Sequence, residues 1–257
     1  MSPVVPLYKP TPPTPPAWRL PVLLLVLLVL LGGLGALFIS RALHRSVVVQ
    51  LPFPDDDAGL EPPPAEGVEG EALGEARSLI DNYALDEATT VLRRVLRDNP
   101  RSARAHAYLA RLAYRRGQRT DGTCDANAVA GAERELLLAD ALQPDLSDSK
   151  LVRGYLAYFG GDFSRAKRLG LAAERDPTIA LRASLLLAQA ASSAGSFDEA
   201  DRRATAIVYR VREGFLSDGA YGVLDEVYAG RHELRRLAAL RKLVAERRAR
   251  ASGTRPR

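Results

Sequence analysis

The chain has 257 residues and 47% of them are hydrophobic, so it is long enough to bury one large core or two small ones. Its formal net charge of +5 is carried by Arg far more than by Lys, a bias typical of GC-rich bacterial coding sequences. A single cysteine excludes an intrachain disulfide, and three scattered histidines offer no metal cluster, so we expect no cofactor.

Residues 1–19 read MSPVVPLYKPTPPTPPAWR and contain seven prolines. Proline fixes φ and removes a backbone donor, so this stretch cannot form a helix and favours extended polyproline II. We interpret it as a disordered, solvated tail. Docking of the tail into an aromatic groove of a partner protein is the alternative.

Residues 20–40, LPVLLLVLLVLLGGLGALFIS, are 21 residues without a charged side chain. At about 1.5 Å per residue, such a helix spans roughly 30 Å, the thickness of the hydrocarbon layer. Trp18 and Arg19 before the segment, and Arg41 and Arg45 after it, are suitable interfacial anchors. A cleaved signal peptide is the alternative, but the run is long for one and no small-x-small site follows. We therefore predict an uncleaved, single-pass transmembrane helix.

Small residues recur at every fourth position of this segment, at Gly32, Ala36 and Ser40. That spacing places them on one helix face, where a second helix can approach closely. We therefore predict a homodimer contact through this face. The alternative is that Gly and Ala are simply frequent in membrane helices.

Residues 41–70 form the next zone, and from position 46 they read SVVVQLPFPDDDAGLEPPPAEGVEG. This mixture of Pro, Gly and acidic side chains buries too little apolar surface to offset the entropy lost on ordering. We predict a disordered linker. Its acidity would hold the following domain away from an anionic bilayer.

From residue 71 the apolar positions follow a helical period that is interrupted at regular intervals. The stretch YALDEATTVLRRVLRDNP at 83–100 repeats its apolar and Pro positions in AGAERELLLADALQP at 130–144. The residues that open successive runs are spaced by 44, 34 and 34 positions: Ala88, Ala132, Ala166 and Ala200. Ten extra residues within 118–129 account for the longer first interval, so we predict one recurring unit of 34 residues.

A 34-residue unit of helix, Gly turn, helix and Pro resembles the tetratricopeptide repeat. The stretches GDFSRAKRLGLAAERDP and GSFDEADRRATAI are very similar to the second-helix signature of that family. The resemblance covers residues 71–212 and implies four repeats, with a fifth partial unit whose Gly230 lies near the position of a turn glycine. It implies an all-α, right-handed α-solenoid of helical hairpins over 71–250. Tyr83 at a turn where Gly is expected, and a weak first helix, depart from the pattern, and an ordinary helical bundle is the alternative.

The resemblance also implies a binding surface, because the first helices of such units line a concave groove. In this sequence the groove is cationic at one end, aromatic in the middle and neutral beyond, where the same register gives Arg182, Leu185, Gln189, Ser192 and Ser193. The predicted groove residues are Arg104, Arg111, Tyr114, Arg115, Tyr155, Tyr158 and Phe159. Guanidinium groups and aromatic rings suit an extended acidic or aromatic peptide. The alternative is that these arginines are merely solvated and that the rings face a neighbouring helix.

The end of the chain is basic, since residues 230–257 hold ten Arg or Lys and two Glu, a balance of +8. An apolar stripe over 234–244 predicts a capping helix with its charges outward, followed by a basic disordered tail at 251–257. Contact with anionic lipid or an acidic partner is the alternative, and nucleic-acid binding is not favoured. The sequence contains no GxSxG, P-loop or HExxH motif, so we do not expect an enzyme.

Together the segments predict a membrane-anchored scaffold that recruits or assembles a bacterial cell-envelope complex, such as secretion, pilus or outer-membrane machinery. A periplasmic chaperone-like client binder and a cytoplasm-facing adaptor for a soluble partner are the alternatives. The positive charges that flank residues 20–40 are nearly balanced, but a short tail before a signal-anchor normally stays in the cytoplasm. We therefore expect an inner-membrane protein whose repeats lie in the periplasm.

Overall fold

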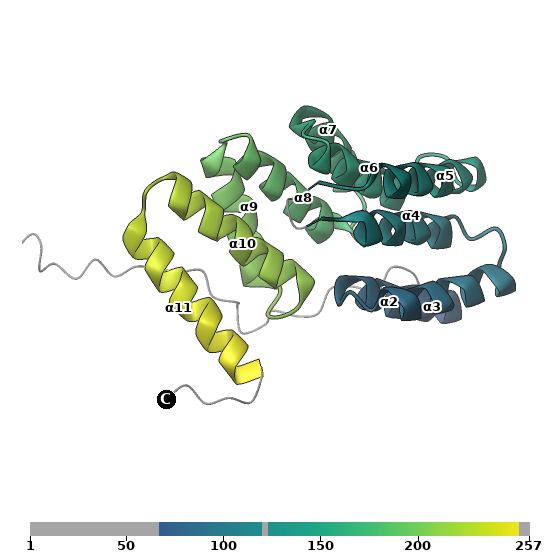
Figure 1. Ribbon diagram of the computed structural model, residues 1–257, viewed down its shortest axis with the longest axis horizontal. Helices are drawn as coiled ribbons and strands as arrows, with labels where there is room; N and C mark the ends of the chain where they lie inside the picture. The colour runs from purple at the N-terminus through teal and green to yellow at the C-terminus, as the bar shows by residue number, and fades with distance from the viewer. Residues whose placement is uncertain (1–66, 120–122, 252–257) are drawn as a thin grey trace, which may run out of the picture. The chain divides into compact units, whose positions relative to one another are not determined.

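The computed structural model describes residues 67–119 and 123–251. These two ranges are all-α and contain no strand, only an isolated bridge between Gln118 and Cys124. Their helices are labelled in Figure 1. They are α2 (Gly67–Asp81), α3 (Leu85–Asp98), α4 (Ala103–Gly117), α5 (Ala126–Leu142), α6 (Ser147–Phe159), α7 (Phe163–Ala173), α8 (Ala180–Ser193), α9 (Phe197–Arg210), α10 (Phe215–Gly230) and α11 (Leu234–Ala251).

The predictions for the first part of the chain lie outside the described residues. They concern the tail 1–19, most of the linker 41–70, and the transmembrane segment 20–40 with Gly32, Ala36 and Ser40. The predicted basic tail after Ala251 lies outside them as well. From α2 to α11, no helix combines the length and the apolar character needed to cross a bilayer.

One linker boundary needs correction, because α2 begins at Gly67, inside the range expected to be disordered. Glu69 in its first turn accepts hydrogen bonds from the Ser102 hydroxyl at 2.6 Å and from the Asn99 side-chain amide at 2.9 Å. Leu73, Ala76 and the other inward residues of α2 are buried. The helix start is therefore held by contacts with the α3–α4 connection, which local composition does not reveal.

The helices form successive hairpins, each made of an even-numbered helix and the helix that follows it. Every even-numbered helix from α2 to α8 also contacts the next even-numbered helix. The chain is thus a repeat-like series in which α2, α4, α6, α8 and α10 follow one another in contact. Side-chain caps mark several helix starts: Ser102 accepts from Ala105 N, Asp125 from Asn127 N and Ala128 N, and Asp162 from Arg165 N.

Four of the hairpin turns have the same geometry. Each contains one residue with positive φ, and the next residue donates its backbone N–H to the carbonyl five positions earlier, as in a Schellman motif. The residues with positive φ are Tyr83 (59°), Gly161 (78°), Gly195 (75°) and His232 (57°). The four hydrogen bonds are Ala84 N to Leu79 O, Asp162 N to Ala157 O, Ser196 N to Ala191 O and Glu233 N to Tyr228 O, at 2.8–2.9 Å. The repeat in the sequence is therefore matched by a repeat in the backbone.

The fifth hairpin corrects the sequence interpretation of Gly230. The left-handed turn residue is His232, and Gly230 is the last residue of α10. A Cβ atom at Gly230 would come within 2.4 Å of the Phe197 ring, so the glycine is explained by close packing of α10 against α9. The hairpin between α4 and α5 also differs, because residues 118–125, within the predicted insert, join these helices.

The predicted periodicity is confirmed by burial, since all four residues that open the repeated runs are fully inaccessible to solvent: Ala88, Ala132, Ala166 and Ala200. The buried apolar residues form successive clusters instead of one central core. One cluster joins α2, α3 and α4, a second extends from α4 to α8, and a third extends from α8 to α11. Each hairpin is therefore stabilised mainly by its neighbours.

Candidate functional site

Asp81, the last residue of α2, is the centre of a buried cluster of charged side chains. It accepts hydrogen bonds from Arg111 of α4 and from Arg182 of α8. Arg182 makes a bidentate contact, with Nη2 at 2.7 Å from Oδ2 and Nη1 at 3.2 Å from Oδ1. Asp81 and Arg182 are 101 residues apart in the sequence, so this carboxylate connects the first hairpin to the fourth.

The charge state of this centre follows from its partners. Burial raises the pKa of Asp81, but the guanidinium groups of Arg111 and Arg182 lower it by a larger amount. The pKa of Asp81 therefore lies below its ordinary value. Burial also opposes the charge on Arg111, and Asp81 more than compensates, so the pKa of Arg111 is raised. The structure therefore holds an ionised carboxylate between two guanidinium groups.

An aromatic ring from the last hairpin covers these guanidinium groups. Phe215, the first residue of α10, has its ring centroid 5.5 Å from the Cζ atoms of Arg111 and Arg182 and 5.4 Å from that of Arg115. Such distances are typical of cation–π contacts. We call Asp81, Arg111, Arg115, Arg182 and Phe215 the guanidinium cluster.

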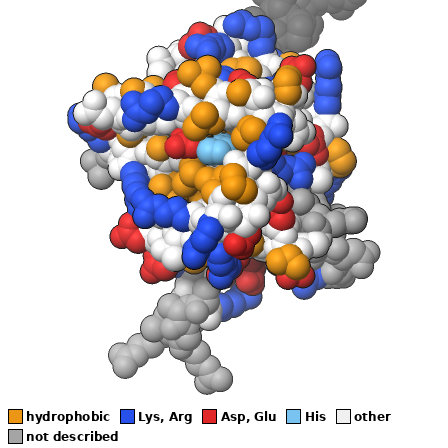
Figure 2. Space-filling model, turned by 90° about the vertical axis from the view of Figure 1, so that its right-hand side faces the viewer, with side chains coloured by type: hydrophobic (Ala, Val, Ile, Leu, Met, Phe, Trp, Pro, Cys, Tyr) orange, Lys and Arg blue, Asp and Glu red, His pale blue; other side chains and the backbone are white. Residues whose placement is uncertain are grey.

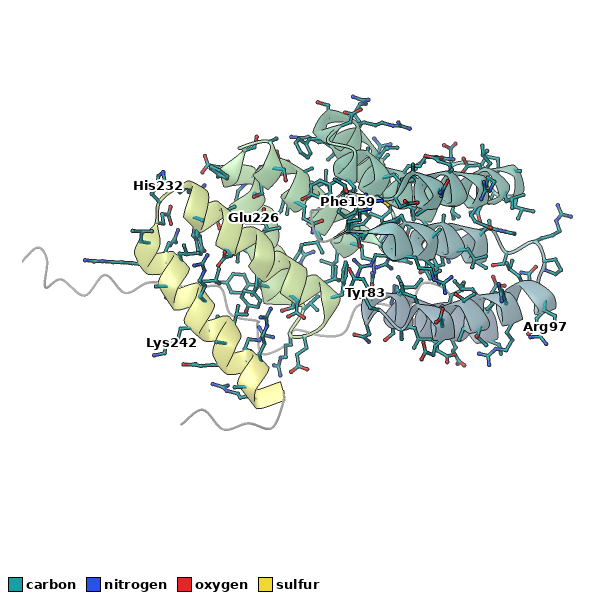
Figure 3. The ribbon with its side chains drawn as sticks, in the orientation of Figure 1. Tyr83, Arg97, Phe159, Glu226, His232 and Lys242 are labelled. Carbon is teal, nitrogen blue, oxygen red and sulfur yellow. The ribbon has the colours of Figure 1, made fainter. Side chains whose placement is uncertain are left out.

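Aromatic side chains form a wall beside the guanidinium cluster. Tyr114, Tyr155 and Phe159 contact one another, with ring centroids 5.8–6.4 Å apart. The Tyr155 hydroxyl is buried and has no hydrogen-bond partner among the described residues, and burial raises the pKa of that tyrosine. Tyr83, at the turn between α2 and α3 in Figure 3, lies over the Arg115 guanidinium at 4.2 Å.

The structure brings most of the predicted groove residues together. Arg111, Tyr114, Arg115, Tyr155 and Phe159 lie in or beside the guanidinium cluster. Tyr158 contacts Phe159 with a centroid distance of 5.2 Å, and its hydroxyl lies 3.3 Å from that of Ser193. Arg104 instead forms an ion pair with Asp148 of α6, with Nε 3.3 Å from Oδ2.

The accessibility of these residues differs from that of an open groove. Arg111, Tyr114 and Tyr155 are 5%, 2% and 4% exposed, so a peptide cannot reach them in this conformation. Arg115, Tyr158 and Phe159 are partly exposed. Binding of a peptide by the full set stays a prediction.

Sequence reasoning missed two members of the guanidinium cluster, Asp81 and Phe215. Asp81 lies at the end of the helix whose pattern was weakest, and Phe215 follows residue 212, where the repeat resemblance ends. The sequence signal for a turn was Gly214, immediately before Phe215, and its φ is 88° in the structure. No neighbouring residue indicates where the Phe215 ring packs.

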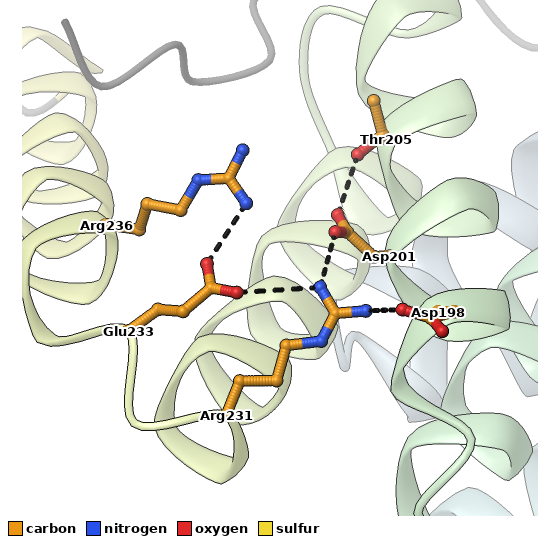
Figure 4. Close-up of polar contacts among 6 residues, drawn as sticks. All are labelled: Asp198, Asp201, Thr205, Arg231, Glu233 and Arg236. Carbon is orange, nitrogen blue, oxygen red and sulfur yellow. Dashed lines mark hydrogen bonds and ion pairs between the residues drawn. The ribbon is translucent and has the colours of Figure 1, made fainter. Parts of the chain in front are cut away.

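A second polar network holds the turn of the last hairpin against α9 (Figure 4). Arg231 forms ion pairs with Asp198 and, at 3.0 Å, with Asp201. Its third partner, Glu233, also accepts from Arg236 at 3.0 Å. These contacts lie at the opposite end of α10 from Phe215, so they fix the hairpin turn and leave the α9–α10 connection outside the network.

The charges outside these networks are mixed. On the face shown in Figure 2, basic and acidic side chains alternate with apolar ones and do not form a field of one sign. On α11, Arg241 makes a bidentate pair with Asp225 at 2.7 and 3.0 Å, and Arg247 donates to the Tyr221 hydroxyl at 2.7 Å. Part of the predicted basic end is therefore used in packing. Across residues 67–119 and 123–251 we find no group of His, Cys, Asp and Glu side chains suited to a metal ion.

Comparisons of the chain with protein-family models, with curated proteins and with solved structures find no match. The structure supports the coarser class, an all-α protein of repeat-like helical hairpins with a buried guanidinium cluster. The functional interpretation therefore depends on the side chains themselves.

Proposed function

We propose that the chain is a membrane-anchored scaffold of tetratricopeptide-like hairpins that binds partner proteins through the side formed by its even-numbered helices. Four equivalent turns and the 34-residue spacing of the sequence support the repeat assignment. The apolar run at 20–40 supports a single-pass anchor, and the repeat domain is placed in the periplasm of a bacterial cell.

One observation carries the binding proposal: cationic and aromatic side chains of the even-numbered helices contact one another. The Tyr114 ring of α4 lies against the Tyr155 and Phe159 rings of α6, and the Arg111 and Arg115 guanidinium groups of α4 lie at the Phe215 ring of α10. Arginine and aromatic residues provide large contact areas and charge-assisted hydrogen bonds, which makes them frequent energetic centres of interfaces. An extended partner segment with acidic and aromatic side chains is the complementary ligand.

The proposal is tested by site-specific photocrosslinking in cells. A photoreactive amino acid at Tyr158 should capture one defined partner, whereas the same group at Tyr209, which is 40% exposed on α9, should not. Capture of many substoichiometric proteins at Tyr158 would instead identify a chaperone-like client binder. Equal capture at both positions would contradict a binding surface on the even-numbered helices.

Membrane orientation is tested separately with reporters fused after Arg257 that are active in only one compartment. Activity of the periplasmic reporter is expected. Activity of the cytoplasmic reporter would contradict the periplasmic location. It would indicate a cytoplasm-facing adaptor that uses the same binding surface.

A further inference from the structure

The guanidinium cluster contains more positive than negative charge. Arg111, Arg115 and Arg182 contribute three positive charges and Asp81 one negative charge, so three minus one leaves +2 among these four side chains. Charge removed from water is unfavourable unless it is paired. The Phe215 ring offers the guanidinium groups only its π face. The one carboxylate, Asp81, pairs with Arg111 and Arg182, so Arg115 has no carboxylate partner within the cluster.

Several buried polar atoms in the guanidinium cluster and in the aromatic wall beside it also have no hydrogen-bond partner among the described residues. The Nε atoms of Arg111 and Arg115 and the Tyr155 hydroxyl are buried without a hydrogen-bond partner among the described residues. Buried donors of this kind are nearly always paired in folded proteins. A carboxylate is the group that accepts from guanidinium donors most strongly.

We propose that the guanidinium cluster binds an aromatic side chain flanked by carboxylates on a partner peptide, and that Phe215 occupies this position in the unbound chain. The partner's ring replaces Phe215 over the guanidinium groups, and its carboxylate accepts from the unused Nε donors of Arg111 and Arg115. The inference rests on the proposed scaffold function. It specifies the chemistry of the ligand and identifies Phe215 as the gate, the side chain that occupies the site until the ligand binds.

The displacement asked of Phe215 is that of one side chain at the start of α10, while the Arg212 carbonyl stays hydrogen-bonded to the Ser217 hydroxyl at 3.3 Å and to Arg247. Residues 212–214 are exposed, and Gly214 has φ of 88° and ψ of −168°, a conformation that side chains other than glycine rarely adopt. Phe215 is only partly buried, whereas Leu216 and Ser217 behind it are 2% and 0% exposed. The ring can therefore leave while the core face of α10 stays packed.

The experiment measures binding of a fluorescent Gly-Ser peptide that carries one Phe flanked by Asp to the full-length chain. Phe215→Ala should bind this probe about fivefold or more tightly than the wild type, the factor that corresponds to one cation–π contact. Adding Arg115→Gln to Phe215→Ala should abolish the gain, as should replacing Asp by Asn in the probe.

Phe197→Ala is the matched control, since Phe197 is the first residue of α9 but contacts Gly230 instead of the guanidinium cluster. An equal gain with Phe197→Ala, or no gain with a folded Phe215→Ala, would overturn the inference. Should Phe215→Ala unfold the chain, fluorophenylalanine at position 215 gives an independent readout by fluorine NMR. Its signal should move to the solvent-exposed position on addition of the probe, and an unchanged signal at saturating probe would refute the gate.

Failure of this inference is distinguishable from failure of the proposed function. If photocrosslinking at Tyr158 captures a defined partner in wild type and Phe215→Ala alike, with no change in efficiency, the scaffold stands and the gate is wrong. If Phe215→Ala gains affinity for the probe while no partner is captured, the site stands and the scaffold proposal is wrong.

Discussion

Asp81 and Asp148 are two buried aspartates with opposite electrostatic environments. The pKa of Asp81 is lowered because Arg111 and Arg182 outweigh its burial, whereas the pKa of Asp148 is raised because burial outweighs Arg104. A lowered pKa in the folded state stabilises it above the unfolded value of about 3.9, and this stabilisation is lost as pH falls through the folded pKa. A raised pKa has the reverse effect, so stability decreases as pH rises from the unfolded toward the folded pKa.

We expect Asp81→Asn to lower the free energy of unfolding at neutral pH by about 3–5 kcal/mol, because both guanidinium partners stay buried. It should also weaken the loss of stability below about pH 4 that the wild type shows. Urea denaturation at several pH values measures both effects.

Asp148→Asn is the control for this substitution. It removes a carboxylate whose ionisation burial disfavours, so at neutral pH it should leave stability within about 1 kcal/mol of the wild type, or increase it. Equal destabilisation by the two substitutions would show that burial, and not the arginine pairing, decides the role of Asp81.

At the scale of single elements, the four equivalent turns share one backbone hydrogen bond but have different residues at the position of positive φ. Glycine adopts that conformation freely, and other residues do so at a cost of about 1 kcal/mol. His232→Gly should therefore raise the free energy of unfolding by about that amount, and Gly161→Ala should lower it similarly. A Cβ at Gly161 would have nothing within 4 Å, so the substitution adds no steric clash and its effect on stability comes from backbone strain alone. Thermal denaturation checks both signs, and a loss of stability in His232→Gly would contradict the assignment.

The crossing of α4 and α5 requires a different glycine. A Cβ at Gly117 would lie 2.2 Å from the Ala128 Cβ, which cannot move without its backbone. Gly117→Ala should destabilise the fold by about 1–3 kcal/mol through overpacking.

Gly222→Ala is the corresponding control, since the added Cβ meets nothing within 4 Å in the interior of α10. Improved helix propensity should raise stability by about 0.5–1 kcal/mol. Chemical denaturation that showed the same change for both variants would exclude close packing as the reason for Gly117.

At the scale of the whole molecule, stabilisation by nearest neighbours predicts local opening, but the Asp81–Arg182 contact connects the first hairpin to the fourth. Native-state hydrogen exchange of Asp81→Asn should therefore accelerate in α2 and also in α8. Asp225→Asn, which breaks only the Arg241 pair between α10 and α11, should accelerate exchange in α11 alone. Faster exchange confined to α2 in Asp81→Asn would mean that the hairpins open independently.

Local patterns were sufficient for much of this fold. The 34-residue period placed Ala88, Ala132, Ala166 and Ala200 at buried helix positions, because apolar spacing and burial are linked through the helical period. The turn at His232 was missed because glycine is the usual residue at positive φ, and Gly230 stands only two positions earlier.

The sequence by itself determined the helical class, the hairpin period and the residue types of the candidate binding surface. Only the tertiary structure decided that Asp81 meets Arg182 and that Phe215 covers three guanidinium groups. The physical reason is range: helical periodicity is set by neighbours within a few residues, whereas the position of a side chain from another hairpin depends on how several successive hairpins pack. The same packing buries Arg111 and Tyr155, which the resemblance to the tetratricopeptide repeat had assigned to a groove.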